Sequence, residues 1–224
     1  MHNMLRGAAA LFAIALPAAA WAEDAVGDWV GKVTVPPGVE LTVATHIAKG
    51  AGGLQGYAES PDQTVTPLPM AEISAAPETL SFTVPSVGGA FKGRWDPQAA
   101  GWVGVLSQNG LDLPLTLVRG VPPPRPVVGG LDGEWSGVLA APQADLRLRL
   151  GVKTDANGTL ALFQSPDQSP QQMVARVSRT GDEVRVELPG IGGLDARLSP
   201  DGQTLSGTWR QNGGSLPLTL KRGG

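Results

Sequence analysis

Residues 108–119, with the sequence QNGLDLPLTLVR, decide the fold of this chain because they occur twice. The second copy, QNGGSLPLTLKR, occupies residues 211–222 near the C-terminus. Two further motifs recur in the same order: GDWVG at 27–31 returns as GEWSG at 133–137, and Ser-Pro-Asp-Gln at 60–63 returns unchanged at 165–168. The chain is therefore one module written twice, and an account of its function has to explain two similar modules.

Apolar and polar side chains alternate along both copies. Leu146, Leu148 and Leu150, for example, alternate with Arg147 and Arg149. Alternation with a period of two residues gives a strand one buried and one solvated face, which is typical of antiparallel sheet. The 31 glycines and 20 prolines punctuate such short runs, as the many turns of a β protein require. We therefore predict an all-β protein.

Turn spacing predicts about eight strands in each module. In the first module the expected strands are residues 27–35, 40–48, 53–59, 67–74, 79–84, 89–95, 101–108 and 113–119. The second module copies them between residues 133 and 222. Short connections favour up-and-down pairing, and eight such strands close into a small barrel. The predicted fold is two tandem up-and-down antiparallel β-barrels.

The sequence divides into four parts. Residues 1–22 are expected to be a signal peptide, residues 23–120 form module 1, residues 121–130 form a linker, and residues 131–224 form module 2. The linker reads VPPPRPVVGG. Consecutive prolines favour an extended, semi-rigid segment, so we expect a spacer between the two barrels.

The N-terminus has the features of a secretory signal peptide. Arg6 provides a positive charge, residues 8–16 are apolar, and Ala20-Trp21-Ala22 matches a small-residue cleavage site. Cleavage after Ala22 would place the protein in the periplasm or outside the cell. The apolar run is shorter than the roughly 20 residues of a membrane-spanning helix, and the chain has no cysteine to carry a lipid, so no membrane anchor is expected.

Charge and cysteine content exclude several classes of function. The formal net charge is −3 and the sequence has no basic run, which argues against nucleic acid or an anionic membrane surface as a partner. The absence of cysteine excludes disulfides, thiol catalysis and cysteine-ligated metal sites. Stability must therefore come from burial of apolar side chains.

The first and last strands of each module carry a matched tryptophan and arginine. By strand parity, Trp29 and Arg119 lie on the core-facing sides of their strands, as do Trp135 and Arg222. In a closed barrel these strands are neighbours, so the guanidinium can lie over the indole. At this point each module resembles the calycins, the lipocalin-like barrels, whose first strand carries Gly-x-Trp and whose last strand carries an Arg or Lys over that Trp.

A second resemblance covers almost all of each module. The order Gly-x-Trp-x-Gly, Ser-Pro-Asp-Gln, and Gln-Asn-Gly before Leu-Pro-Leu-Thr-Leu-x-Arg is similar to the β-domain that precedes the catalytic domain in some secreted bacterial serine hydrolases of the α/β-hydrolase class. In that family the catalytic residues belong to a domain that this sequence lacks. The resemblance therefore implies a non-catalytic protein.

The sequence also offers little material for catalysis. It has no Gly-x-Ser-x-Gly nucleophile elbow, and His46 is the only histidine after the signal peptide. We expect His46 to be a solvent-facing strand residue without a counterpart in module 2. The sequence predicts no metal site and no cofactor, although a pair of carboxylates for glycoside hydrolysis is not ruled out by sequence alone.

Four glutamines are the candidate ligand-binding residues. Gln63 and Gln168 end the repeated Ser-Pro-Asp-Gln motif, where they either face a barrel mouth or tie down the turn, and turn geometry is the simpler interpretation. Parity turns Gln108 and Gln211 toward the barrel interior. A polar group there needs a partner, either within the protein or in a ligand, and an internal partner is the more common case.

The sequence leaves several functions open. The preferred hypothesis is a non-catalytic secreted protein whose barrels bind a small apolar or amphipathic molecule. One alternative is an interaction module for an envelope protein such as a hydrolase, and another is an accessory protein for hydrolysis of glycans or lipids. A connected void inside a barrel favours ligand binding, whereas filled interiors favour the interaction module.

Overall fold

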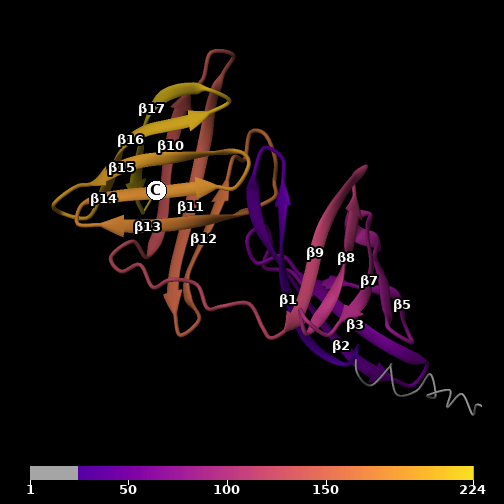
Figure 1. The fold of residues 1–224 in the computed structure, drawn as a ribbon. Coiled ribbons are helices and arrows are strands. Elements are labelled where there is room, and N and C mark those ends of the chain that lie inside the picture. Colours follow the sequence, from indigo (N-terminus) through magenta and orange to yellow (C-terminus); the bar gives the residue numbers. More distant parts are fainter. Residues whose placement is uncertain (1–24, 224) are drawn as a thin grey trace, which may run out of the picture.

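The computed structural model describes residues 25–223 and is built almost entirely of antiparallel strands, arranged as two barrel-like sheets. Figure 1 shows module 1 in indigo to magenta and module 2 in orange to yellow, joined by one extended segment. The predicted all-β fold of two tandem barrels is confirmed. The predicted signal peptide lies outside the described residues.

Module 1 is a nine-stranded sheet that nearly closes. Its strands pair in the order β4-β3-β2-β1-β9-β8-β7-β6-β5, so hydrogen bonding is continuous except between β4 and β5. The strands are β1 (Gly27–Val35), β2 (Val39–Gly50), β3 (Gly53–Glu59), β4 (Leu68–Pro69), β5 (Ala71–Ala76), β6 (Thr79–Val84), β7 (Gly89–Asp96), β8 (Gly101–Gln108) and β9 (Leu111–Arg119).

The ninth strand arises because residues 67–74, predicted as one strand, are split. Met70 lies between β4 and β5, where its backbone N–H donates to the carbonyl of Gly56 at 3.0 Å. The register of β5 against β6 then shifts between Ala71 and Ser74. Within a few residues the chain therefore changes its pairing partner from β3 to β6. As a result the sheet stays open between β4 and β5.

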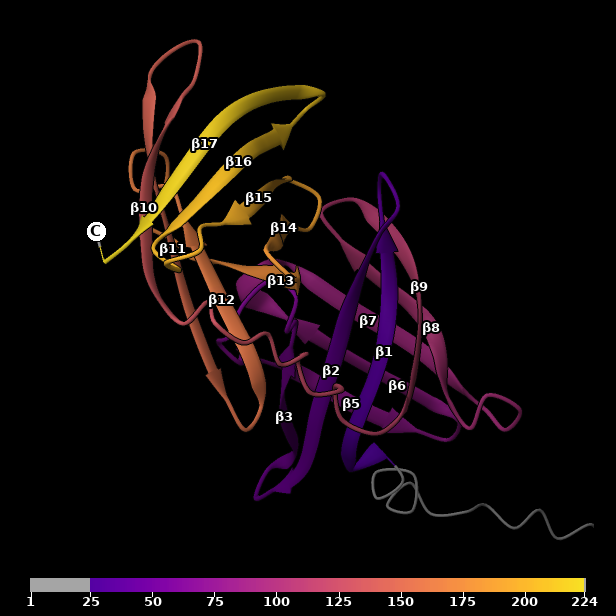
Figure 2. The same cartoon turned by 90° about the vertical axis from the view of Figure 1, so that its left-hand side faces the viewer.

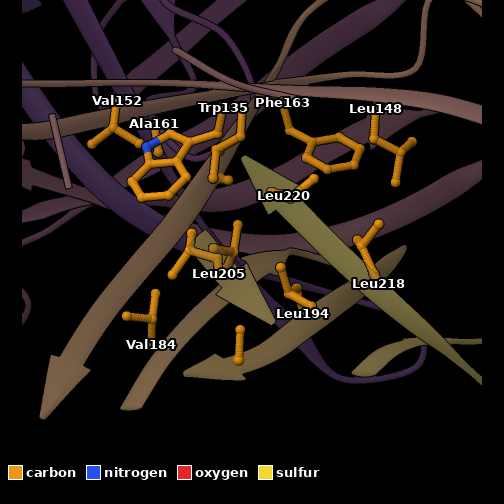
Figure 3. Packing of buried hydrophobic residues seen from close by; sticks show 14 of the residues in the cluster. Trp135, Leu148, Val152, Ala161, Phe163, Val184, Leu194, Leu205, Leu218 and Leu220 are labelled. Carbon is orange, nitrogen blue, oxygen red and sulfur yellow. The ribbon is translucent and has the colours of Figure 1, made fainter. Parts of the chain in front are cut away.

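Module 2 is a closed barrel of eight strands in sequence order, the number predicted. The strands are β10 (Gly133–Ala140), β11 (Asp145–Asp155), β12 (Gly158–Gln164), β13 (Met173–Thr180), β14 (Glu183–Leu188), β15 (Gly192–Leu198), β16 (Thr204–Gln211) and β17 (Gly214–Arg222). Its core consists of inward-facing aliphatic and aromatic side chains, among them Trp135, Phe163 and Leu205 (Figure 3).

The repeated motifs shape the turns and strand contacts that close each sheet. Asn109 and Gly110 connect β8 to β9 with φ of 51° and 75°, and Asn212 and Gly213 connect β16 to β17 in the same way. Positive φ at both positions suits a tight hairpin with the twist of the sheet, and Asn-Gly adopts it with little strain. Gly31 of β1 lets β1 and β9 approach each other closely, because a Cβ at this position would lie 2.2 Å from the Thr116 carbonyl oxygen of β9.

The linker joins the two modules and is also hydrogen-bonded to module 2, which the sequence did not indicate. The Arg125 N–H donates to the Asn157 carbonyl at 3.2 Å, and the Thr159 N–H donates to the Pro126 carbonyl at 3.0 Å. The Val128 N–H donates to the Thr159 hydroxyl at 2.8 Å, and the Val128 side chain is buried in the core of module 2. The segment continues along the β11–β12 hairpin because its few backbone N–H and C=O groups find partners there.

Candidate functional site

One end of each barrel is closed by the tryptophan and arginine of the first and last strands. The Arg119 guanidinium lies 4.2 Å from the centroid of the Trp29 ring, and the Arg222 guanidinium lies 4.3 Å from that of Trp135. Both indoles are buried, and the Trp29 N–H donates to the Ala25 carbonyl at 2.9 Å. This end of each module is therefore sealed against water.

Module 1 packs additional aromatic bulk at this sealed end. Trp29, Trp95 and Trp102 contact one another edge to face, with ring centroids 5.2–6.1 Å apart. Leu198 and Leu205 occupy the positions of Trp95 and Trp102 in module 2. The two copies therefore distribute their large side chains differently along the barrel axis.

The opposite end of module 1 is hollow. A cavity of about 980 Å³ opens there, a volume suited to a small-molecule ligand. Its floor and walls are aliphatic or aromatic, formed by Val33, Val35, Leu41, Val43, Ala58, Leu68, Phe82, Val84, Leu106 and Leu113. The rim also carries exposed apolar side chains, namely Val65, Val87 and Leu111.

Two aligned positions carry small side chains at the hollow end of module 1 and aromatic side chains in module 2. The Phe163 and Trp209 rings stack in module 2, with centroids 5.3 Å apart and planes inclined by 10°, and both side chains are buried. When the copies are aligned on their repeated motifs, Ala58 and Leu106 stand at these positions in module 1. Both line the cavity. The methyl and isobutyl groups leave more room at this end of module 1 than the two stacked rings leave in module 2.

Two of the four predicted glutamines lie at the cavity. Gln63 and Gln108 line it, while Gln168 and Gln211 do not. The Gln108 amide N–H donates to the Val87 carbonyl at 3.1 Å, and the Gln211 side-chain oxygen accepts from the Trp209 indole at 3.3 Å. Gln108 therefore has a partner within the protein and presents its remaining amide atoms at the rim.

The Ser-Pro-Asp-Gln motif builds a turn in both copies. The backbone N–H of Gln63 donates to the Ser60 carbonyl at 2.8 Å, and that of Gln168 donates to the Ser165 carbonyl at 3.0 Å. The Ser60 hydroxyl also donates to the side-chain oxygen of Gln63 at 2.7 Å. Turn geometry therefore accounts for the motif, and in module 1 the same turn places Gln63 at the rim.

The rim is polar but almost free of charge. Its hydrophilic side chains are amides and hydroxyls, from Ser60, Gln63, Thr64, Thr66, Gln108, Asn109, Gln164, Gln171 and Gln172. Glu59 is the one ionisable residue among the described residues that line the cavity, which include no Lys, Arg or His. A carboxylate or phosphate would find no cation in this lining, whereas a hydroxyl or amide finds many hydrogen-bonding partners.

Module 2 forms part of the cavity wall, a feature that the sequence did not indicate. Leu162, Gln164, Met173, Val174 and residues 170–172 all line the cavity. They come from β12, β13 and the connection between them, and β13 lies beside module 1 in Figure 2. The cavity is therefore lined by both modules, with most of the lining residues in module 1.

An ion pair joins the modules beside this wall. Arg176 of β13 donates to Asp62 Oδ1 from Nε at 3.1 Å and from Nη2 at 2.8 Å, and Nη2 also donates to the Glu40 carbonyl at 2.7 Å. Burial raises the pKa of Asp62, but the hydrogen bonds from the Thr42 N–H and from Arg176 outweigh it, so the pKa lies below its ordinary value.

The low pKa of Asp62 predicts a loss of stability in acid. A carboxyl whose pKa is lower in the folded state stabilises that state above its unfolded pKa of about 4, and the contribution disappears as pH falls through the folded value. We expect Asp62→Asn to lower the unfolding free energy at pH 7 and to have little effect at pH 2. Urea unfolding at both pH values measures this, and an equal loss at both would contradict the assignment.

His46 lies outside the cavity and is more covered than predicted. Its side chain is 19% exposed, because the Tyr57 ring stacks on it with centroids 4.4 Å apart. Nδ1 lies 2.7 Å from Asp28 Oδ1, and Nε2 lies 3.4 Å from Glu59 Oε2. The ring lies on the outer face of the barrel, as the strand pattern predicted, but Tyr57 covers much of it.

Two other properties of residues 25–223 concern metal binding and membrane-crossing helices. Within this part of the chain, no group of three or more His, Asp or Glu side chains is placed to hold a metal ion. None of the helical turns described there has the length and apolar character of a membrane-crossing helix.

Comparison with known proteins gives no family. No protein-family model and no curated protein matches the chain. A solved structure of unknown function from the DUF3598 family of Nostoc punctiforme is 15% identical, covers 89% of this chain and 97% of its own, and has a TM-score of 0.26. Kievitone hydratase from Nectria haematococca is 9% identical, with coverages of 88% and 89% and a TM-score of 0.25. Scores this low carry no inference about function.

Proposed function

We propose that the protein is a non-catalytic binding protein, exported through its signal peptide, whose module 1 holds one small amphipathic molecule. The observation that carries the proposal is the apolar cavity of about 980 Å³ in module 1, at the end that Phe163 and Trp209 fill in module 2. A deep apolar pocket with a few polar groups at its mouth is the usual form of a small-molecule site.

The lining also suggests the chemical class of the ligand. The buried walls suit an alkyl or other aliphatic body, and the amides and hydroxyls of the rim suit a head group that donates and accepts hydrogen bonds. A charged head group would lose hydration without gaining an ion pair, and an anion would also face Glu59. The proposed ligand is therefore an uncharged amphiphile with a hydroxyl or amide head.

The wider setting follows from the same features. The resemblance to the β-domain of secreted serine hydrolases suggests an accessory role beside such an enzyme, in which the barrel holds or delivers a neutral lipid. We propose no turnover by this chain, because His46 is held on the outer wall and does not line the cavity, and Glu59 is the one ionisable residue in the described cavity lining.

The test is a competition between neutral and charged amphiphiles. N-phenyl-1-naphthylamine serves as the fluorescent probe, and a monoacylglycerol and a fatty acid of equal chain length serve as competitors at pH 8. We expect the monoacylglycerol to displace the probe at least about tenfold more effectively, a difference of about 1.4 kcal/mol. Equal displacement by both would refute the neutral head group, and no probe binding would refute the cavity as a binding site.

A single substitution at the rim supplies the matched control. Gln108→Lys places a cation at the cavity mouth, where the wild-type lining has none. The preference should then shift toward the fatty acid, because its carboxylate gains an ion pair. Gln211→Lys makes the same change at the equivalent position of module 2 and should leave the preference unchanged.

A further inference from the structure

The aspartate of the repeated Ser-Pro-Asp-Gln turn has the same backbone role in both modules but a different side-chain partner. In module 2, Asp167 accepts from the Arg147 N–H at 2.7 Å and also pairs with the Arg147 guanidinium. The hydrogen bonds from Arg147 hold the pKa of Asp167 below its ordinary value. Module 2 therefore satisfies this carboxylate entirely from its own strand β11.

In module 1 the arginine is missing and the other module supplies it. Asp62 accepts from the Thr42 N–H at 2.7 Å, the counterpart of the Arg147 bond, but threonine has no guanidinium to offer. Arg176 of module 2 takes that place with two hydrogen bonds to Asp62 Oδ1. The arginine that pairs with Asp167 thus belongs to the same module, whereas the arginine that pairs with Asp62 belongs to the other module.

This inter-module pair is more sheltered than its counterpart and lies next to the cavity. The Asp62 side chain is 17% exposed and Arg176 is 41% exposed, against 28% and 67% for Asp167 and Arg147. Asp62 precedes Gln63 at the rim, and Arg176 follows Met173 and Val174, which line the cavity from module 2. The pair therefore fixes the position of the second module where it forms the cavity wall.

We propose that Asp62 and Arg176 form a latch that holds module 2 over the mouth of the module 1 cavity, so that Met173 and the amides of residues 171 and 172 complete the binding site. This inference rests on the proposed function for its ligand, but not for the latch. In this arrangement module 2 serves as the wall and cover of the site in module 1. Release of the amphiphile then requires the latch to open.

The experiment measures module positions and ligand release separately. Because the chain has no cysteine, Gln98→Cys and Ala144→Cys place one spin label on an exposed turn of each module. Double electron–electron resonance then gives the distribution of distances between the two labels. Stopped-flow fluorescence of N-phenyl-1-naphthylamine gives the release rate. Asp62→Asn keeps an acceptor for the Thr42 N–H while removing the charge, and Arg176→Gln removes the partner.

We expect both latch variants to broaden the distance distribution and to release the probe about 3- to 10-fold faster, the range for a partly sheltered ion pair. The matched variants Asp167→Asn and Arg147→Gln should change neither. A distance distribution that stays narrow in the latch variants would refute the proposal that Asp62 and Arg176 hold the modules together. A broadened distribution with an unchanged release rate would refute the proposal that module 2 covers the cavity. If the wild-type protein binds no probe, the proposed function fails, while the distances still decide the latch.

Discussion

The double variant Ala58→Phe, Leu106→Trp is expected to lose amphiphile binding. Its affinity for the probe should be at least about tenfold weaker, a loss of about 1.4 kcal/mol in binding free energy. These substitutions place in module 1 the two aromatic residues that stack in the interior of module 2. The scaffold accepts them there, so we expect the variant to fold. Titration of N-phenyl-1-naphthylamine with the full chain measures the loss.

The control for this variant lies at the other end of the same barrel. Trp95→Leu and Trp102→Leu introduce the residues found at these positions in module 2, away from the cavity lining. They should lower stability but retain probe binding under native conditions. Undiminished binding by the filled variant would show that the probe occupies some other part of the molecule.

Trp135→Ala is expected to lower the unfolding free energy of module 2 by about 3–5 kcal/mol, the usual loss when a buried tryptophan is truncated. The indole is buried, donates to the Leu131 carbonyl at 2.8 Å and lies under the Arg222 guanidinium. Arg222→Ala should cost less, because its side chain lies at the end of the barrel. Urea unfolding followed by circular dichroism gives both values.

The coupling between these two residues is the more specific quantity. A double-mutant cycle over Trp135 and Arg222 should show an interaction of about 0.5–2 kcal/mol, the range for a partly desolvated cation over an indole. Trp135→Phe provides a milder variant that keeps a ring beneath the arginine if the alanine variant does not fold. Additive losses would mean that the guanidinium contributes nothing through the indole.

Strand parity and the internal repeat were enough to predict the fold. The predicted and observed bounds coincide for β1, β3, β6 and β8, because alternation and turn residues mark these strands clearly. The break at Met70 was missed although the apolar alternation changes phase there, from Leu68 and Met70 to Ile73 and Ala75. The two short strands have different partners, because β4 pairs with β3 and β5 pairs with β6. Alternation does not report the partner of a strand.

The binding site was harder to predict, for a different physical reason. Ala58 and Phe163 are both inward-facing apolar residues, so a pattern of burial treats them alike, while the cavity depends on their difference in volume. Aligning the two copies position by position would have shown this signal. The latch could not be found in this way, because Arg176 reads as an ordinary solvated strand residue and its partner Asp62 lies 114 residues away.

Photo-crosslinking with a monoacylglycerol that carries a diazirine in its acyl chain tests the central claim most directly, because it locates the ligand. Peptide mapping of the labelled full chain should place the crosslinks on the cavity walls of module 1, such as Leu41 and Leu106, and on Met173 of module 2. Labelling should disappear in the Ala58→Phe, Leu106→Trp variant. Crosslinks inside the module 2 barrel, or labelling that persists in the filled variant, would contradict the account.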